Sequence, residues 1–519
     1  MRSIIIILFL FSFFAESSFG QSCLPEGLTI TRQSQVDSFK IVYPNCNSIQ
    51  GDLEINGANS HITSLTGLNG IEFALGTLNI HDTDSLYTLS GLEHIKQIGK
   101  DFKISDNQNL RSFLGLSSLK LIGGRLFVVN NFNLINFGGL DSLQRIVGYL
   151  NINGNNNLLS FEGPHMLDSL GSSISIAGNQ RIKNLQGFEG IQFLRGTINI
   201  ADNDSLLNYT GLGSLKAIFG DITLTSNDRA VDFYGFDSLT NIYGNLLINS
   251  NGNINLHGFI SLQKIWNDLR FYNNQALINL EGLETLHTIR GTLSFKENHH
   301  IKNFRGLDSL NTIGASLVID QNDSLLSLSG LEKIKSINGF LEIKNNKTLI
   351  DLSSLLGLSS VSGKLNIYAN DLLPSLYGLN NIDPFKIENL LLQGSNKLSD
   401  CSVESICTYL AYGRPSTIAG NDSGCNTDQE ISHACFLASN GPPEEDAIYL
   451  SPNPTSNITE VHGFDLSQSV INLSDIQGRK VTNYEILNNI INLNLLPDGI
   501  YIISFQFQNQ RIVKRIVKI

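Results

Sequence analysis

The chain has 519 residues, 41% of them hydrophobic, and a formal net charge of −12. This length exceeds that of one ordinary globular domain. The acidic balance disfavours a nucleic-acid partner, because proteins that bind nucleic acids usually carry a basic face. Beyond that exclusion, the net charge indicates little more than solubility.

The first 20 residues have the pattern of a secretory signal peptide. Arg2 precedes an apolar run from Ile4 to Phe14, and Ser18-Phe19-Gly20 forms a small-residue cleavage site before Gln21. A membrane anchor is the alternative, but a run of about 11 residues is shorter than the roughly 20 that a spanning helix needs. We expect cleavage, export and no transmembrane segment in the mature protein.

Six cysteines follow the signal peptide, all of them outside the repeats described below: Cys23, Cys46, Cys401, Cys407, Cys425 and Cys435. An even count in an exported chain predicts disulfides. The first two form the natural pair of an N-terminal cap over residues 21–50. The last four, in a helical cap over residues 399–438, allow three connectivities. Zinc is the alternative, but spacings of 6, 18 and 10 residues do not resemble paired C-x-x-C ligands.

An apolar stripe at i, i+3, i+4 and i+7 predicts an amphipathic helix over residues 402–411 of the C-terminal cap. A capping box formed by Thr427 and Glu430 predicts a second short helix that ends near Cys435. Such caps cover the unpaired strand edges and the exposed core at the two ends of a repeat array.

Between the caps, residues 51–398 repeat around a column of asparagines spaced 24 residues apart, with one step of 23. The twelve positions are Asn107, Asn131, Asn155, Asn179, Asn203, Asn227, Asn251, Asn274, Asn298, Asn322, Asn346 and Asn370. The recurring frame is roughly G-x-L-x-I-x-x-N-x-x-L-x-x-L-x-G-L-x-x-L-x-x-I. A fixed period of this length predicts a solenoid in which each turn contacts only its neighbours.

Each position of the frame has a structural interpretation. The alternating L-x-I step predicts a short half-buried strand. The two glycine columns mark bends, where φ is positive or two backbones approach closely. The asparagine satisfies backbone groups that a bend leaves unpaired, and stacked copies bond to one another. About fifteen turns at a strand spacing of about 4.8 Å would make a rod roughly 70 Å long.

The L-x-I-x-x-N portion of this frame resembles leucine-rich repeats, and the fuller frame resembles the receptor L-domain family over residues 51–398. The resemblance implies an all-β, right-handed parallel β-solenoid. It implies little about the ligand, because that family binds different partners through different faces.

Outward positions on the predicted strands are mostly small or polar, with one exception. Trp266, Arg270 and Tyr272 come together where Asn267 replaces the corner glycine. A tryptophan beside a cation and a phenol predicts a ligand patch that stacks on a sugar or anchors a protein. The alternative is ordinary scattered aromatic exposure.

A carbohydrate-active β-helix enzyme, a polysaccharide lyase or hydrolase, is the alternative function. Turn length is almost constant, and His299-His300 stands without a matching carboxylate cluster or nucleophile motif. We therefore predict no enzyme, and no catalytic, cofactor-binding or metal-binding residue. Aspartates beside the asparagine column suggest calcium as an alternative, but they lack the glycine-aspartate nonapeptide pattern. The recurring Asp-Ser-Leu triplet resembles a short acceptor for O-linked glycosylation.

A proline-rich linker, SNGPPEEDA, occupies residues 439–447. After it, short β-rich runs alternate with turn residues and predict a small Ig-like β-sandwich over residues 448–519. Four elements stand out in it: L-S-P-N-P from residue 450, G-R-K-V from 478, L-P-D-G-I-Y from 496 and K-R-I-V-K from 514.

These elements resemble the type A C-terminal sorting domain of the type IX secretion system. The residues that carry the motif are Pro452, Asn453, Pro454, Gly478, Pro497, Gly499, Tyr501, Lys514 and Lys518. The resemblance implies recognition by the type IX machinery, passage through the periplasm, and attachment to surface lipopolysaccharide or release. We therefore expect a secreted or cell-surface adhesion protein of a Gram-negative bacterium, with a protein or glycan ligand. A purely structural surface-layer role is a third possibility.

Overall fold

The structure is a computed structural model that describes residues 22–58, 61–439, 449–451, 453–462, 470–487, 489–507 and 510–519. The chain divides into two compact units, with the boundary after Asp428. The predicted signal peptide, residues 440–447 of the predicted linker and Pro452 lie outside the described residues.

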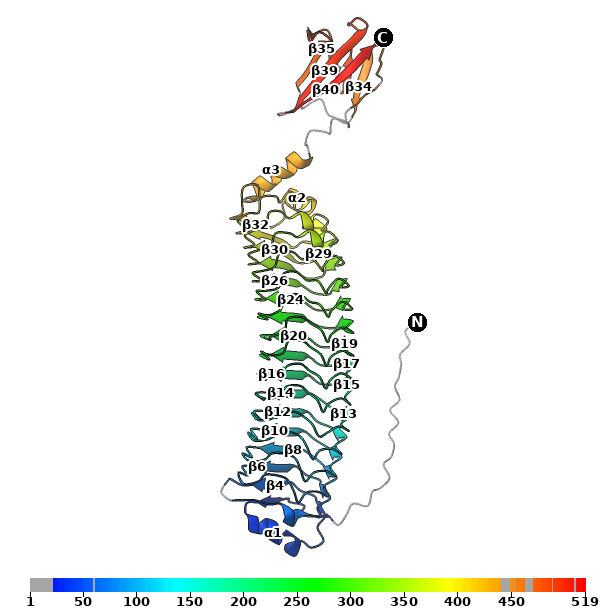
Figure 1. Ribbon diagram of the computed structural model, residues 1–519. Helices are drawn as coiled ribbons and strands as arrows, with labels where there is room; N and C mark the ends of the chain where they lie inside the picture. The colour runs from blue at the N-terminus through cyan, green and yellow to red at the C-terminus, as the bar shows by residue number, and fades with distance from the viewer. Residues whose placement is uncertain are drawn as a thin grey trace, which may run out of the picture. The chain divides into compact units, whose positions relative to one another are not determined.

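One ladder of parallel strands runs through the first unit (Figure 1). Its seventeen described strands are β2 (Leu28–Ile30), β4 (Leu53–Asn56), β6 (Leu78–His81), β8 (Phe102–Ser105), β10 (Leu126–Val129), β12 (Leu150–Asn153), β14 (Ile174–Ala177), β16 (Ile198–Ala201), β18 (Ile222–Thr225), β20 (Leu246–Asn249), β22 (Leu269–Tyr272), β24 (Leu293–Lys296), β26 (Leu317–Asp320), β28 (Leu341–Lys344), β30 (Lys364–Tyr368), β31 (Asn389–Gln393) and β32 (Ser416–Ala419). Each pairs in register with the strand one turn away, as Ile174 does with Ile198.

Two-residue strands form a second parallel ladder on the other side of each turn (Figure 1). A first sheet contains β1 (Ser22–Cys23), β3 (Ser48–Ile49), β5 (Phe73–Ala74), β7 (Gln97–Ile98), β9 (Leu121–Ile122), β11 (Arg145–Ile146) and β13 (Ser169–Leu170). A second contains β15 (Phe193–Leu194), β17 (Ala217–Ile218), β19 (Asn241–Ile242), β21 (Lys264–Ile265), β23 (Thr288–Ile289), β25 (Thr312–Ile313), β27 (Ser336–Ile337) and β29 (Ser360–Val361). The ladder is interrupted between β13 and β15.

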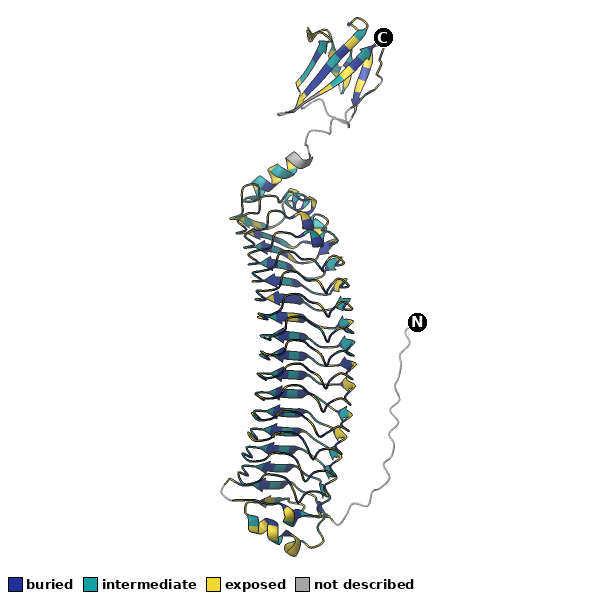
Figure 2. Cartoon of the chain, viewed as in Figure 1, coloured by how far each residue is buried: buried dark blue, intermediate teal, exposed yellow. Residues whose placement is uncertain are grey.

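The interior follows from the alternating pattern of the long strands. In β16 the side chains of Ile198 and Ile200 are buried while their neighbours are half exposed, and Figure 2 shows the same alternation in successive turns. Burying one leucine or isoleucine contributes about 1.5–3 kcal/mol, so each turn is held mainly by the apolar residues it shares with its neighbours. Phenylalanine rings also pack against one another inside, as those of Phe113 and Phe137 do with centroids 5.0 Å apart and 45° between their planes.

The asparagine column is a continuous buried hydrogen-bond ladder. Asn131 donates its backbone N–H to Oδ1 of Asn155 at 3.0 Å, and its Nδ2 to the carbonyl of Ile104 at 3.0 Å. Each side chain therefore connects its own turn to the turns before and after it. The ladder also crosses the 23-residue step, where Asn251 donates to Oδ1 of Asn274 at 3.2 Å.

The bends use two different backbone solutions. The residue before most ladder asparagines has a positive φ, such as Asp106 at 58° and Ala369 at 53°. The glycine of the G-L step also has a positive φ, as at Gly211. The glycine ahead of the long strand instead meets close backbone approach, since a Cβ on Gly220 would lie 2.5 Å from the carbonyl oxygen of Gly196.

Each end of the solenoid adds structure that the repeat frame does not contain. The N-terminal segment supplies β2 and a helix, α1 (Gln33–Val42), whose Val36 and Phe39 are buried. The C-terminal segment supplies β32 and α2 (Glu404–Ala411), which lies within the helix predicted over 402–411. The remaining helices are α3 (Asp428–Ser439) and the 3-10 turns η1 (Thr66–Leu68), η2 (Ser353–Leu355), η3 (Tyr377–Leu379) and η4 (Pro384–Lys386).

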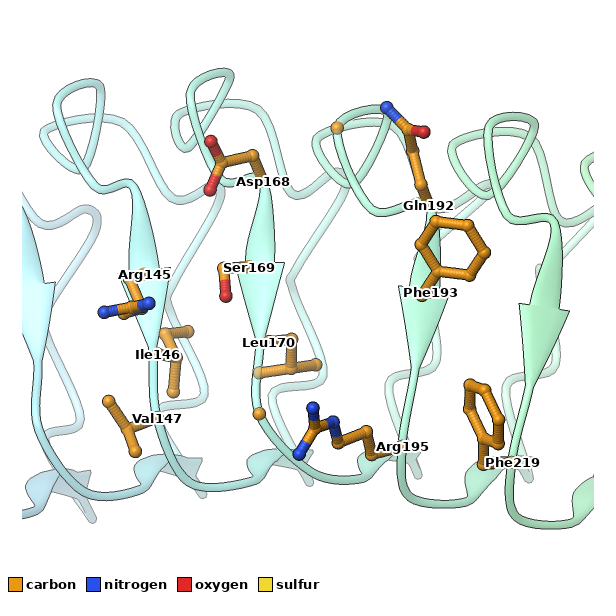
Figure 3. Close-up of a pocket in the computed structure, with 12 residues that line it drawn as sticks. Arg145, Ile146, Val147, Asp168, Ser169, Leu170, Gln192, Phe193, Arg195 and Phe219 are labelled. Carbon is orange, nitrogen blue, oxygen red and sulfur yellow. The ribbon is translucent and has the colours of Figure 1, made fainter. Parts of the chain in front are cut away.

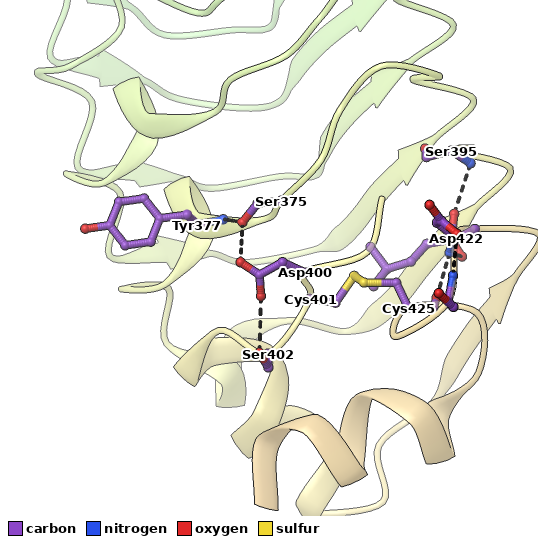
Figure 4. Close-up of a disulfide and its surroundings, with 11 residues drawn as sticks. Ser375, Tyr377, Ser395, Asp400, Cys401, Ser402, Asp422 and Cys425 are labelled. Carbon is purple, nitrogen blue, oxygen red and sulfur yellow. Dashed lines mark hydrogen bonds between the residues drawn. A yellow bond between two sulfur atoms is a disulfide. The ribbon is translucent and has the colours of Figure 1, made fainter. Parts of the chain in front are cut away.

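Two disulfides connect successive turns at the ends. Cys23 pairs with Cys46, and Cys401 pairs with Cys425, with Cα atoms 5.6 and 5.7 Å apart. Figure 4 shows the second bridge beside Asp400, which accepts hydrogen bonds from the hydroxyls of Ser375 and Ser402. Cys407 and Cys435 are also in the disulfide state, so the described residues contain no free thiol.

The second unit contains two four-stranded antiparallel sheets. One consists of β33 (Tyr449–Ser451), β34 (Ile458–His462), β38 (Ile490–Asn492) and β37 (Glu485–Leu487), and the other of β36 (Lys480–Val481), β35 (Val470–Asp475), β39 (Gly499–Phe507) and β40 (Gln510–Lys518). Their shared core includes Leu473, Ile491 and Ile503, each fully buried. The predicted fold class, a parallel β-solenoid followed by a small antiparallel β domain, is confirmed.

Candidate ligand-binding surface

Four large side chains stack along one corner of the solenoid, and we call them the corner column: Phe219, Tyr243, Trp266 and Arg290. Each follows a short strand and lies one turn from the next. The backbone N–H of Trp266 donates to the carbonyl of Ile242 at 2.9 Å, and that of Arg290 to Ile265 at 3.0 Å. Because this in-register bonding holds successive turns at the strand spacing, equivalent side chains stack.

The geometry of the column is close to ideal stacking. The rings of Phe219 and Tyr243 lie 4.8 Å apart with 9° between their planes, and those of Tyr243 and Trp266 lie 5.1 Å apart with 20°. The guanidinium of Arg290 lies 3.9 Å from the Trp266 ring centroid. An aromatic pair contributes about 0.5–1.5 kcal/mol and an exposed cation–π contact about 0.5–1 kcal/mol. The column is therefore ordered before any ligand arrives.

The column remains accessible despite this stacking. Phe219 is 52% exposed and Tyr243 is 37% exposed. Trp266 is half-buried: Tyr243 and Arg290 cover its two faces, and its indole Nε1 is buried without a hydrogen-bond partner. Phe219 ends the stack, and Tyr243 is the only ring that contacts it among the described residues, which leaves one face of Phe219 open.

The predicted patch of Trp266, Arg270 and Tyr272 is divided between two parts of the turn. Trp266 lies on the corner, whereas Arg270 and Tyr272 lie on β22. Arg270 forms an ion pair with Asp268, and the stacking partners of Trp266 come from the neighbouring turns. A search at steps of 23 and 24 residues from Trp266 would have found these partners in the sequence.

Several charged side chains on the outer face of the long strands are paired with one another. His81 contacts Glu54 at 3.0 Å and Asp82 at 2.8 Å. Burial opposes charging of His81, but the hydrogen bonds with both carboxylates outweigh it and raise the pKa of His81. The hydrogen bond with His81 also lowers the pKa of Glu54 against the effect of burial. These groups act as structural ion pairs.

The histidine pair has ordinary surroundings. His299 lies 3.4 Å from Asp323, and His300 hydrogen-bonds to the carbonyl oxygen of Gln275. Within the described residues, no three or more His, Cys, Asp or Glu side chains are grouped so that they could hold a metal ion.

The sorting-motif residues gather at one end of the second unit. The side chain of Asn453 bonds to the backbone of Arg515 and Val517 on β40. The hydroxyl of Tyr501 donates to the carbonyl of Pro497 at 2.7 Å. Lys518 is buried and donates to the carbonyls of Leu496 and Asn494.

The remaining motif positions lie in turns or strands: Gly478 at φ +79° between β35 and β36, Gly499 at the start of β39 and Lys514 within β40. The motif thus ties the first and last strands and the turn before β39 into one arrangement.

The first unit is thus a parallel β-solenoid with a partly exposed aromatic column, and the second is a small antiparallel β-sandwich. Residues 45–137 match the family model described as the receptor L domain, and residues 447–519 match the one described as the secretion system C-terminal sorting domain. Both matches confirm the resemblances seen in the sequence. No curated protein matches the chain.

The sorting domain identifies a secreted or surface protein that the type IX secretion machinery handles. The match to the receptor L domain over residues 45–137 points to a binding protein. No helix in the described parts of the chain combines the length and apolar character that a membrane crossing requires.

Proposed function

We propose that this protein is an adhesin, a cell-surface or released binding protein of a Gram-negative bacterium. A signal peptide over residues 1–20 directs it to the periplasm, and the sorting domain directs it across the outer membrane. It is then attached to lipopolysaccharide or released. The solenoid contacts a protein or glycan ligand through the corner column, with Arg270 and Tyr272 of β22 extending the contact.

The observation that carries this proposal is the stack of Phe219, Tyr243, Trp266 and Arg290. Tryptophan, tyrosine and arginine are the residues that contribute most to binding surfaces. Ordering them in advance lowers the entropic cost of binding. Elsewhere on the described solenoid, exposed aromatics lie without a second ring, as Tyr87 does, or form a single pair, as Phe385 does with Tyr412.

The test is an unbiased pull-down and a glycan array with protein purified from outside the cell. Trp266→Ala should lower retention of the captured ligand about tenfold or more, as expected for a central contact, and Tyr272→Ala should lower it to a smaller extent because Tyr272 lies on β22 beside the column. Tyr87→Ala is the matched control, because Tyr87 is 51% exposed and lies against Arg111 but outside the column. Ligand retention that is equal in all three variants would contradict the proposal.

Export is tested separately. Removal of residues 448–519 should leave the protein inside the cell envelope, and removal of residues 1–20 should leave it in the cytoplasm. In a strain without lipopolysaccharide O-chains, less of this protein on the cell surface and more of it in the medium would support attachment to lipopolysaccharide. Unchanged surface levels would argue against it.

A further inference from the structure

The short-strand ladder contains one open edge within the solenoid. At the next pair of short strands, β15 and β17, the ladder is intact. The backbone N–H of Lys216 donates to the carbonyl of Gln192 at 2.8 Å, and that of Phe219 donates to the carbonyl of Leu194 at 2.9 Å. The equivalent bonds from Gln192 to Asp168 and from Arg195 to Leu170 are not formed. Two backbone donors and two carbonyls therefore face a gap between β13 and β15.

The break follows the turn that contains Gly163-Pro164 in place of Gly139-Leu140 one turn earlier. Gly163 has a φ of +148°, wider than the +103° of Gly139. The ladder asparagines on either side keep their spacing and their hydrogen bonds. The opening is therefore confined to the short-strand side.

A groove of about 950 Å³ occupies this gap. Ligand sites for small molecules typically measure roughly 300–1,000 Å³. Figure 3 shows Ser169 and Leu170 on β13 before the gap, Arg145 one strand further back on β11, Phe193 on β15 after the gap, and Arg195 reaching back toward Leu170. Phe219, the open end of the corner column, also lines the groove.

The groove is locally cationic. Arg145 and Arg195 line it together with a single carboxylate, that of Asp168. Neither guanidinium has a hydrogen-bond, ion-pair or ring partner among the described residues. By contrast, Arg125 is paired with Asp101 and Arg270 with Asp268. Two unpaired guanidiniums in one groove of a chain with a net charge of −12 favour an anionic ligand.

The groove also offers flat apolar faces. Phe193 is 57% exposed, and the face of Phe219 that Tyr243 does not cover is free. Aromatic side chains of this kind bury large apolar surfaces of a ligand. The ring of a sugar presents C–H groups on its faces and hydroxyls around its rim. The unpaired backbone donors and carbonyls of the open edge suit those hydroxyls.

We propose that this groove binds a short stretch of an anionic polysaccharide, with the carboxylate or sulfate groups on Arg145 and Arg195 and a sugar ring on Phe193 or Phe219. Guanidinium forms paired hydrogen bonds with such anions. An added peptide strand is a poorer fit, because the edge is only two residues long on each side. This assignment rests on the proposed binding function and specifies its ligand class.

Binding of three purified hexasaccharides to the full-length protein tests the proposal by titration calorimetry: an oligogalacturonate, a sulfated heparin fragment and neutral maltohexaose. The double variants Arg145→Gln/Arg195→Gln and Phe193→Ala/Phe219→Ala should each weaken binding of the anionic probe about tenfold or more. Arg229→Gln and Phe132→Ala are matched controls, because both residues are exposed and lie beside the asparagine column, away from the groove. Thermal unfolding of each variant verifies that it is folded.

The expected result is binding of an anionic probe but not of maltohexaose, lost in both double variants and retained in both controls. Preference for one anionic probe identifies carboxylate or sulfate as the recognised group. Any of three results would overturn the groove assignment. The double variants could bind the anionic probe as well as the unmodified protein does, maltohexaose could bind equally well, or no probe could bind. The adhesin proposal survives those results if the pull-down still captures a partner through Trp266, and it fails on its own if no partner is captured.

Discussion

Replacement of Asn203 by alanine tests the asparagine ladder at its centre. The side chain of Asn203 accepts the backbone N–H of Asn179 at 3.1 Å. Its Nδ2 donates to the carbonyls of Ile176 at 3.0 Å and Ala201 at 2.9 Å. The substitution removes the acceptor from one buried N–H and one donor from each of two carbonyls. It also removes the longer bonds, each 3.3 Å, that the Asn203 amide forms with the amides of Asn179 and Asn227.

The magnitude follows from these three groups. A buried N–H without any partner costs about 1–3 kcal/mol, and the loss of one hydrogen bond at each carbonyl costs about 0.5–1.5 kcal/mol. We therefore expect Asn203→Ala to lower the free energy of unfolding of this part of the solenoid by about 2–6 kcal/mol. Asn199→Ala is the control, because Asn199 lies on the same turn and its side chain forms no ladder bond; its effect should stay within about 0.5 kcal/mol.

Amide hydrogen exchange followed by mass spectrometry or NMR provides the assay, because it resolves local opening in a repeat protein. The ladder has a direction, so the Asn179 amide should lose protection at least about tenfold, which corresponds to about 1.4 kcal/mol. The Asn227 amide donates to Asn251 at 3.1 Å and should stay protected. Equal protection of the Asn179 amide in wild type and Asn203→Ala would refute the reasoning.

Three further predictions concern the end bridge, one ion pair and one glycine. Cys401→Ser with Cys425→Ser opens a loop of 24 residues and should lower the free energy of unfolding by about 3 kcal/mol, measured by denaturant titration of the oxidised protein; no change would contradict the stabilising role of the bridge. Folding raises the pKa of His81, so its contribution to stability is complete below the unfolded pKa of about 6.5 and disappears as pH rises through the folded pKa. His81→Gln should therefore lower Tm more at acidic than at alkaline pH. An opposite trend would exclude this ion pair as the cause. Gly220→Ala should cost about 1–3 kcal/mol because its Cβ would overlap the preceding turn, whereas Gly213→Ala, with nothing within 4 Å, should be neutral in the same melting experiment.

The period of the sequence predicts most of the solenoid for a physical reason. Equal turns in register place equivalent residues at the strand spacing, so one column such as that of Asn131 and Asn155 determines the rest. The ends follow other rules. Thr83 and Ser395 take the asparagine position there, and Asn421 accepts the backbone N–H of Ser395 at 3.0 Å. A repeat defined by asparagine alone therefore misses these two turns, because they carry a hydroxyl residue at that position.

The candidate sites were harder to predict, because they depend on neighbours one turn away rather than on neighbours in the chain. Chain order places Trp266 beside Arg270, although its stacking partner is Tyr243. The groove leaves no mark on the period, since the turn with Pro164 has the same length as its neighbours. Only the missing hydrogen bonds between β13 and β15 reveal it.

The most direct test of the central claim, that turns stack in register, is a set of distances between spin labels on the outer face of the long strands. Asn79, Ser175, Thr223 and Val318 occupy equivalent positions on β6, β14, β18 and β26. At about 4.8 Å per turn, labels four, six and ten turns apart should lie roughly 19, 29 and 48 Å apart. Stacking in register predicts that the distances measured by pulsed electron resonance rise linearly with the number of turns. Distances that level off, as in a globular domain, would contradict it.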